Sequence, residues 1–305
     1  MARETYVAQV QMLVRILPYV ADEQIFALKG GTAINLFYRD MPRLSVDIDL
    51  TYLPIKERAE SLTEINNAID RIAVAIEGGI PSAKTQRIKG GGGGATRLLA
   101  RLNGAEIKIE TSPVTRGVIH TPEKREVSEV VEEAFGYAEM KIVAFEDLFG
   151  GKLHAALDRQ HPRDLYDVKL LYENEGLTDE LFRTFLIYVA CSPRPAHELL
   201  NPNLINLDQP YAREFEGMTR AAVALDELLE TRKKLIADIQ SRFDENTKHF
   251  LLGLHDGEPE FAVIDRPQAA NLPAVKWKLL NLSKLMQENA EKHAAQRREL
   301  QALFG

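Results

Sequence analysis

The sequence of 305 residues is poor in cysteine and contains no long hydrophobic run. Its single cysteine, Cys191, excludes an internal disulfide framework and fits a reducing cytoplasm. No stretch approaches the roughly 20 consecutive apolar residues that a membrane-spanning helix needs. The chain also begins with charges at Arg3 and Glu4 instead of the continuous apolar core of a signal peptide. We therefore expect a soluble cytoplasmic protein without a membrane anchor.

The chain also lacks an excess of basic residues. Its formal net charge is −7 and its pI is about 5.6, which argues against a broad, non-specific nucleic-acid binder, because such proteins need a large positive field. A local basic groove remains compatible with this balance. The histidines show no zinc-ligand spacing, and no Ser-His-Asp or nucleophile-elbow signature occurs. Zinc enzymes and serine hydrolases are therefore disfavoured.

What the sequence does contain is a pair of aspartates in a predicted strand. In SVDIDLT, residues 45–51, the side chains alternate, so Ser45, Asp47 and Asp49 share one face. The Cα atoms of alternate residues lie roughly 6.6 Å apart, from about 3.3 Å of rise per residue, close enough for two carboxylates to share divalent cations. Because aspartate is depleted in strands, this pattern favours a metal site over a solvated strand face.

A glycine turn precedes that strand. Gly30 and Gly31 are predicted to end a short strand and open a helix running to Tyr38, with Thr32 as its cap. The first amides of such a helix form a site for a nucleotide phosphate. A Gly-Gly turn alone is weak evidence, since most are only tight turns. The order of turn, helix and carboxylate strand is stronger, and it indicates a nucleotide site.

A third carboxylate is predicted on a neighbouring strand. In EIKIET, residues 106–111, Ile107 and Ile109 alternate with charged residues. Two-metal phosphoryl-transfer sites use ions roughly 3.5 to 4 Å apart and need additional acids to hold both. Glu110 is the predicted ligand, with Glu106 as the alternative. A solvated face of an edge strand is the other interpretation of this segment.

Two blocks of the sequence resemble a known family. The block GGTAINLFYR…RLSVDIDL, residues 30–50, is similar to the first motif of the nucleotidyltransferase superfamily, and it most closely resembles the AbiEii/AbiGii toxin family. The block EDLFGGKLHAALDRQHPRDLYDVKLL, residues 146–171, is similar to that family's downstream Lys and R-D-x-x-D motif. In the C-terminal third only HFLLGLHDGEPEF, residues 249–261, adds a weaker likeness.

The resemblance implies a functional role for Lys152, Asp164 and Asp167, which would otherwise be interpreted as structural residues. Lys152 corresponds to the motif lysine that contacts nucleotide phosphate, and Asp164 or Asp167 corresponds to the motif aspartate. Arg163 is expected to pair with one of these aspartates. The resemblance also places Arg43 beside the site, where it would meet triphosphate or acceptor RNA, and surface salt bridging is its other interpretation. Taken alone, a lysine in a helix and an aspartate in a first helical turn are usually surface or capping residues.

These expectations define a complete candidate site. The expected catalytic residues are Asp47, Asp49, Lys152, Asp164 and Asp167. The expected nucleotide contacts are Gly30, Gly31, Thr32, Arg43, Ser45 and Lys152. The expected ligands of a pair of Mg²⁺ ions are Asp47, Asp49 and Glu110. Because Ser45 shares the face of both aspartates, we hypothesise that an antitoxin acts by covering or modifying that face.

The predicted fold is α+β. Residues 1–138 are expected to form a nucleotidyltransferase-like mixed β-sheet flanked by helices, with the glycine run at residues 90–94 as a hairpin loop. Residues 139–305 are expected to be all helical, to contribute the motif lysine and aspartates, and to bind the acceptor or a partner. The pattern predicts one long helix over residues 273–304, with an apolar first half and a charged second half that projects.

Three functions remain open at this point. The first is a magnesium-dependent nucleotidyltransferase toxin of a toxin–antitoxin or phage-defence pair, which the resemblance implies adds a nucleotide from an NTP to the 3′ end of tRNA and so blocks translation. The second is the same chemistry on a protein side chain or a small molecule, which the acidic net charge favours mildly. The third is a nucleotide-sensing or antitoxin-binding module without turnover, which is disfavoured because every motif residue is present.

Overall fold

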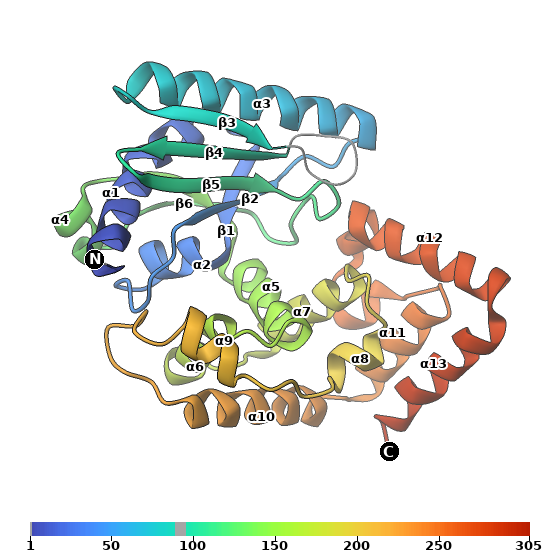
Figure 1. Ribbon diagram of the computed structural model, residues 1–305. Helices are drawn as coiled ribbons and strands as arrows, with labels where there is room; N and C mark the ends of the chain where they lie inside the picture. The colour runs from blue at the N-terminus through green and yellow to red at the C-terminus, as the bar shows by residue number, and fades with distance from the viewer. Residues whose placement is uncertain (1, 89–95) are drawn as a thin grey trace. The chain divides into compact units, whose positions relative to one another are not determined.

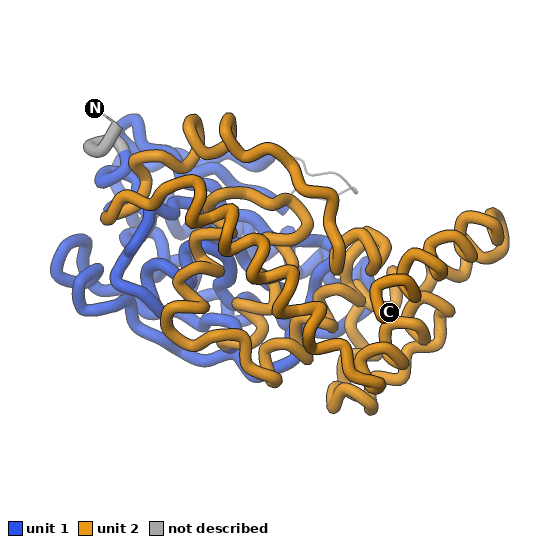
Figure 2. Tube along the Cα trace, turned by 90° about the horizontal axis from the view of Figure 1, so that it is seen from below, with its two compact units in different colours: residues 1–144 blue, residues 145–305 orange. Residues whose placement is uncertain are grey.

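The computed structural model describes residues 2–88 and 96–305, so the glycine run at 90–94 lies outside the described residues. The chain forms two compact units, residues 1–144 and 145–305 (Figure 2). The first holds all the described strands and the second is built of helices. This confirms the predicted α+β class. The boundary expected after residue 138 falls before the last strand of the first unit.

The first unit alternates helices and strands. In chain order its elements are α1 (Ala2–Ala21), β1 (Phe26–Lys29), α2 (Gly30–Ala33), the π-helical turn η1 (Ile34–Tyr38), β2 (Asp47–Tyr52), α3 (Arg58–Gly79), β3 (Lys84–Ile88), β4 (Arg97–Leu102), β5 (Ala105–Thr111), β6 (Glu123–Glu126), α4 (Glu129–Phe135) and β7 (Glu139–Ile142).

The strands form one mixed sheet in the order β3-β4-β5-β2-β1-β7-β6 (Figure 1). The central strand β2 is parallel to β5 and antiparallel to β1, and β1 is parallel to β7. The β3–β4, β4–β5 and β6–β7 pairs are antiparallel. Strand β2, which carries the DxD pair, therefore lies in the interior of the sheet with a neighbour on each side.

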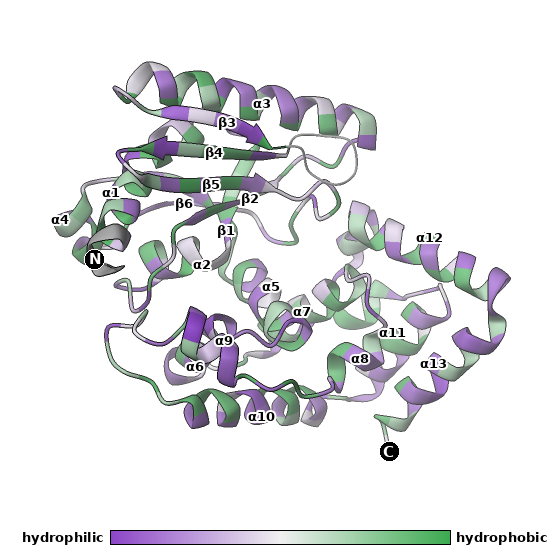
Figure 3. Ribbon diagram, viewed as in Figure 1, coloured by the Kyte–Doolittle hydropathy of each residue, from purple (hydrophilic) through white to green (hydrophobic). Residues whose placement is uncertain are grey.

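Strand alternation divides the residues of the sheet between two faces. Ile48 and Leu50 of β2 and Ile107 and Ile109 of β5 are fully buried. Helix α1 packs against β5 and β7, and α3 packs against β3 and β4. Both helices carry apolar and polar stripes, visible for α3 in Figure 3. The apolar face of the sheet is therefore the core, and the opposite face presents the charged residues of the same strands.

Two strands of this unit were not predicted. The charged segment Glu123–Glu126 forms β6 and Glu139–Ile142 forms β7, which extend the sheet beyond β1. The expectation that residues 139–305 are all helical is therefore wrong for β7. Each strand has only four residues, which is too short for an alternation pattern to separate it from loop or helix.

The second unit consists of α-helices and two short 3₁₀ helices. Its elements are α5 (Phe145–Asp158), α6 (Pro162–Asn174), α7 (Asp179–Ala190), α8 (Ala196–Leu200), α9 (Asp208–Glu214), α10 (Leu225–Ser241), α11 (Glu245–His255), η2 (Phe261–Ile264), η3 (Pro267–Asn271), α12 (Pro273–Glu288) and α13 (Ala290–Ala302). Among the described helices, none combines the length and apolar character that crossing a bilayer requires.

The long helix predicted over residues 273–304 is two helices. Asn289 lies between them with φ −151° and ψ 70°, and its side chain accepts a hydrogen bond from the backbone N–H of Lys292. Helix α13 packs against α11 and α8, and its Leu300 is fully buried. The expectation that the charged half projects is therefore wrong, because Asn289 ends one helix and caps the next.

Candidate active site

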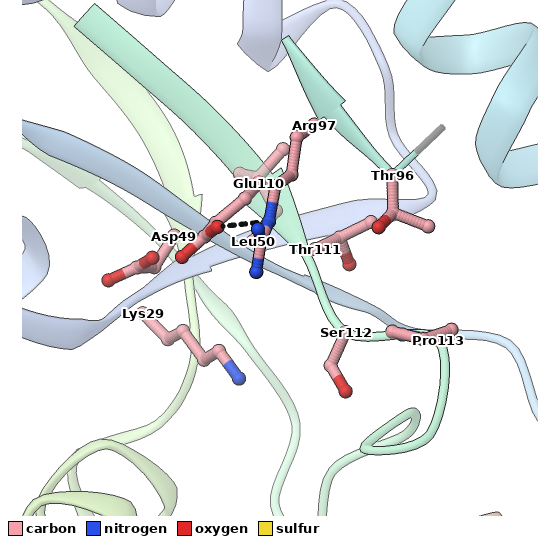
Figure 4. A pocket seen from close by; sticks show the side chains of 9 residues that line it. All are labelled: Lys29, Asp49, Leu50, Thr96, Arg97, Glu110, Thr111, Ser112 and Pro113. Carbon is pink, nitrogen blue, oxygen red and sulfur yellow. Dashed lines mark ion pairs between the residues drawn. The ribbon is translucent and has the colours of Figure 1, made fainter. Parts of the chain in front are cut away.

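The central feature of the polar face is a row of four charged residues, one from each of four neighbouring strands. Lys29 of β1 is the register partner of Asp49 of β2, Asp49 is the partner of Glu110 of β5, and Glu110 is the partner of Arg97 of β4. The row therefore runs cation, acid, acid, cation across the sheet (Figure 4). Arg97 Nε lies 2.9 Å from Glu110 Oε2.

Asp47 and Lys108 form a second register pair beside this row. Lys108 Nζ lies 3.8 Å from Asp47 Oδ2 and 3.2 Å from Glu110 Oε1, so it is shared between the two carboxylates. Glu106, the alternative third acid, is instead the partner of Arg101 and lies 2.7 Å from its Nε. Glu110, and not Glu106, is thus the acid that faces the DxD strand.

The glycine turn lies directly against these acids. A Cβ atom on Gly30, whose φ is +75°, would be 2.6 Å from Asp49 Oδ2. A Cβ atom on Gly31 would be 2.7 Å from both Ser45 Oγ and an Arg43 guanidinium nitrogen. Both contacts are closer than carbon can approach, so a side chain at either position would displace the Asp49, Ser45 or Arg43 group beside it, and at Gly30 the positive φ adds backbone strain. The turn therefore brings Arg43, Ser45 and Asp49 to the first helical amides.

The buried Thr32 links helix α2 to strand β2 by a hydrogen bond. Its side chain is buried, and its hydroxyl donates a hydrogen bond to the backbone carbonyl of Asp47 and lies 3.1 Å from Ser45 Oγ. Helix α2 already begins at Gly30, without a side-chain cap. The prediction that Thr32 caps the helix is therefore wrong, and its hydroxyl instead fixes the backbone of the DxD strand.

A pocket of about 260 Å³ opens beside the charged row. It is lined by Lys29, Asp49, Leu50, Thr96, Arg97, Glu110, Thr111, Ser112 and Pro113 (Figure 4). One wall thus carries two acids and the other carries hydroxyl groups and a proline. The pocket combines negative charge, positive charge and hydrogen-bonding groups, as expected where a charged ligand is held at a specific orientation.

The predicted residues of the second unit form a compact buried cluster. Lys152 of α5 lies 2.8 Å from Asp164 Oδ1 and 3.0 Å from Asp167 Oδ2, both on α6. The exposed Arg159 also pairs with Asp164 at 2.5 Å. Arg163 lies 3.9 Å from Glu214, so the expectation that it pairs with one of the two aspartates is not met by the ion pairs within this unit.

The two glycines before Lys152 explain how α5 is held. A Cβ atom on Gly150 would lie 3.1 Å from the ring of Tyr188 on α7, and one on Gly151 would lie 3.3 Å from the same ring. Tyr188 donates a hydrogen bond of 3.1 Å to the buried Asp147. The Tyr188 ring therefore packs against the glycine pair, where larger side chains would crowd it.

Comparison with known proteins identifies the fold and the family. The family model described as nucleotidyl transferase AbiEii toxin, type IV toxin–antitoxin system, matches residues 11–281. The chain belongs to the AbiEii family. AbiEii membership makes it a nucleotidyltransferase toxin, and it implies an NTP substrate and a cognate antitoxin. This confirms the resemblance found in the two sequence blocks.

A solved structure shows the same fold. MenT4, a nucleotidyltransferase toxin of Mycobacterium tuberculosis H37Rv, is similar to this AbiEii-family chain with a TM-score of 0.61 at 16% sequence identity. The similarity covers 91% of this chain and 93% of MenT4. No curated protein gives a significant match.

Burial and the charge of Lys29 act on the pKa of Asp49 in this AbiEii-family site in opposite directions. Burial raises the pKa of Asp49, Lys29 lowers it, and the neighbouring charges of Glu110 and Asp47 raise it again. Burial likewise lowers the pKa of Lys29, against the effect of Asp49 and Glu110. The charged form of Asp49 is therefore disfavoured in the free protein, and an added cation would relieve the repulsion among the acids.

The donor chemistry suits Mg²⁺, which prefers carboxylate oxygens. Within residues 2–88 and 96–305, however, no group of three or more His, Cys, Asp and Glu side chains lies close enough to hold a metal ion. Lys108 lies between the carboxylates of Asp47 and Glu110, and Arg97 pairs with Glu110. These side chains would have to turn away before three acids could share a cation.

Three members of the charged surface were missed as site residues. None of Lys29, Lys108 and Arg97 was predicted to belong to the site. Each is the register partner of a predicted acid or lies beside one. The signal was available for Lys29, because a lysine that directly precedes the glycine turn must lie next to the carboxylate strand once the two strands pair.

Proposed function

We propose that this AbiEii-family protein is a metal-dependent nucleotidyltransferase that transfers a nucleotide from an NTP to the 3′ end of tRNA, which would block translation in the cytoplasm. The observation that carries the proposal is the pairing of Asp49 with Glu110 on adjacent strands, with Asp47 on the same face and the glycine turn against Asp49. Phosphoryl-transfer enzymes use acids of this kind to hold metal ions, and backbone amides to bind phosphate.

Each residue of the first unit has a distinct part in the proposed reaction. Asp47, Asp49 and Glu110 would hold divalent cations, which supply charge neutralisation on the transferred phosphoryl group when bound. The amides of Gly30 and Gly31 would receive the phosphates, helped by Arg43 and Ser45 beside Gly31. Thr32 would act indirectly, by fixing the strand that carries both aspartates.

The second unit would supply Lys152 together with Asp164 or Asp167. Its lysine is held between two buried carboxylates, so an approaching triphosphate would compete with them for the ammonium group. This supports a role in which Lys152 is oriented by the aspartates. Toxicity would be restrained by the cognate antitoxin, and protection against phage is the proposed biological use.

The test is transfer of labelled NTPs, each supplied separately, to total RNA and to protein from a cell extract. We expect label in the tRNA fraction, dependent on Mg²⁺ and removed by a chelator. tRNA whose 3′ terminal diol has been oxidised with periodate should accept none. Label confined to protein would instead support the second class of acceptor and overturn the tRNA proposal.

Three variants test the site. Asp47→Ala and Glu110→Gln are expected to lower transfer by at least about 100-fold, because each removes charge needed at the metal-binding face. Glu106→Gln removes a similar charge from the same strand as Glu110, but it lies beside Arg101, so it should retain activity. Full activity of Asp47→Ala in Mg²⁺ would refute the proposed chemistry.

A further inference from the structure

Lys29 differs from the other cations around the two acids of the four-strand row. It ends β1 directly opposite Asp49 and lines the pocket together with Glu110. Arg97 and Lys108 each lie within 3.2 Å of a Glu110 oxygen. Within the described part of the chain, no side chain lies within ion-pair distance of Lys29 Nζ, although the charges of Asp49 and Glu110 act on it from farther away.

The side chain of Lys29 is directed into the pocket and is only partly exposed. In Figure 4 it runs from below Asp49 into the space between the two acids and Ser112. An ammonium group that is partly exposed and has no carboxylate within ion-pair distance depends on water for its hydrogen bonds. A ligand that brings acceptor oxygens into this pocket can replace that water at Lys29 Nζ.

The neighbours of Lys29 indicate that this ligand is an anion. Ser112 Oγ already accepts hydrogen bonds from the backbone N–H groups of Val114 and Thr115, so its hydroxyl hydrogen remains available to donate. Arg97 adds a second positive charge on the far side of Glu110. A ligand at this position would meet an ammonium and a hydroxyl donor beside the acids predicted to hold cations.

We propose that Lys29 is a substrate-binding residue whose ammonium group contacts a phosphate of the NTP in the pocket that it forms with Asp49, Glu110 and Ser112. The proposal rests on the proposed nucleotidyltransferase function and adds a phosphate contact within the first unit, separate from Lys152. In the free protein the positive charge of Lys29 interacts with Asp49 and Glu110. In the complex its ammonium group would contact a phosphate of the substrate.

The competing role for Lys29 is purely structural, as a counter-charge that keeps two acids together on adjacent strands. The two roles differ in what they do to kinetics. Loss of a phosphate contact raises the KM for NTP and leaves the KM for the RNA acceptor unchanged. Loss of a structural counter-charge lowers the fraction of folded enzyme, so it reduces the apparent kcat and leaves both KM values in place.

The direct test measures binding of inorganic triphosphate to the full chain in Mg²⁺ without acceptor. Lys29→Met is expected to weaken this binding on the order of 10- to 100-fold, the range for losing a hydrogen bond between charged groups. Lys29→Arg keeps the positive charge and should bind within about 3-fold of the wild type. Lys124→Met removes the same charge from an exposed position on β6 and should bind like the wild type.

Lysine-acetylation footprinting of the wild-type protein tests the proposal even if Lys29→Met does not fold. Triphosphate is expected to protect Lys29, but not Lys124, from acetylation by an amine-reactive reagent, as read by mass spectrometry. Equal labelling of Lys29 with and without triphosphate, or wild-type affinity of a folded Lys29→Met, would overturn the proposal. A wild-type protein that binds neither triphosphate nor any NTP would overturn the proposed function itself, which separates the two failures.

Discussion

Gly30 and Asp49 are in contact across two elements of the site: a methyl group on Gly30 would lie 2.6 Å from Asp49 Oδ2. Gly30 has φ +75°, in the left-handed region that side chains other than glycine rarely adopt. The glycine thus meets two independent requirements, one of backbone conformation and one of space. The carboxylate can stay where it is only while residue 30 has no side chain.

Gly30→Ala is expected to abolish nucleotide transfer and to lower the free energy of unfolding by about 2–4 kcal/mol, the sum of backbone strain and overpacking. Gly104→Ala is the matched control, because Gly104 has φ +85° and a Cβ atom there would meet nothing within 4 Å. It should lose only about 1 kcal/mol and keep its activity. Chemical denaturation and the transfer assay separate these effects. Equal activity losses in both variants would show that the contact with Asp49 is irrelevant.

Asp49→Asn is expected to remove activity and raise stability at the same time. Burial raises the pKa of Asp49 in the folded protein, so the folded state holds this proton more tightly than the unfolded state. Stability therefore falls as pH rises from the unfolded pKa, about 3.9, through the raised folded value, and the charged form remains costly at pH 7. The asparagine lacks that cost, and we expect a melting temperature about 2–4 °C higher. A lower melting temperature would contradict this account.

The sheet face and its acids could be predicted because alternation is a local property. The pattern around Asp47 and Asp49 fixes which side chains share a face, and a β-branched or apolar residue at every second position fixes the other face. The pairing of Asp49 with Glu110, by contrast, depends on the register of two strands far apart in sequence. That register was expected only through the need of a metal site for a third acid.

The ion pairs that Lys108 and Arg97 form with the acids could not be predicted in the same way. Lys108 lies between two of them because its side chain reaches from β5 to Asp47 of β2, and Arg97 of β4 reaches Glu110 on β5. The sequence shows these residues only as alternating charges on separate strands. The break at Asn289 was available as a signal, since an asparagine followed by charged helical residues is a common helix start, but the continuous polar pattern concealed it.

Lys152 was predicted from the family resemblance to contact nucleotide phosphate, but it also has a structural role in the second unit. Its ammonium group is buried between Asp164 and Asp167. Burial raises the pKa of Asp164, but Lys152 and Arg159 outweigh this and hold it below its usual range. The resemblance pointed to the residue, whereas the ion pairs could be seen only once α5 and α6 were packed together.

Lys152→Met is expected to lower the free energy of unfolding by about 3–5 kcal/mol, because it removes the buried cation shared by two carboxylates. Arg159→Met removes a cation from the same Asp164, but this side chain is 63% exposed, so its loss should cost at most about 1 kcal/mol. Urea denaturation of both variants measures the difference, and transfer rates should be normalised to the folded fraction. A Lys152→Met protein as stable as the wild type would argue against this structural role.

The C-terminal helix α13 is attached through a symmetric pair of histidines. The rings of His255 and His293 stack with centroids 4.2 Å apart, and each Nε2 lies 3.0 Å from the backbone carbonyl oxygen of the other residue. The adjacent Asp256 and Arg297 form a two-pronged ion pair between α11 and α13. His293, Asp256 and Arg297 are the charged and titratable groups acting on His255.

Acidification is expected to weaken this attachment. Burial lowers the pKa of His255, which outweighs its hydrogen bond to His293, so the unfolded state takes up a proton at a higher pH than the folded state does. Stability is therefore fully present above the unfolded pKa, about 6.5, and is lost as pH falls towards the lower folded value. Hydrogen exchange of α13 amides between pH 8 and about 5 measures this loss. In His255→Gln, whose amide can still donate to the His293 carbonyl, the exchange-derived stability of α13 should depend less on pH, and an unchanged slope would assign the loss to other groups.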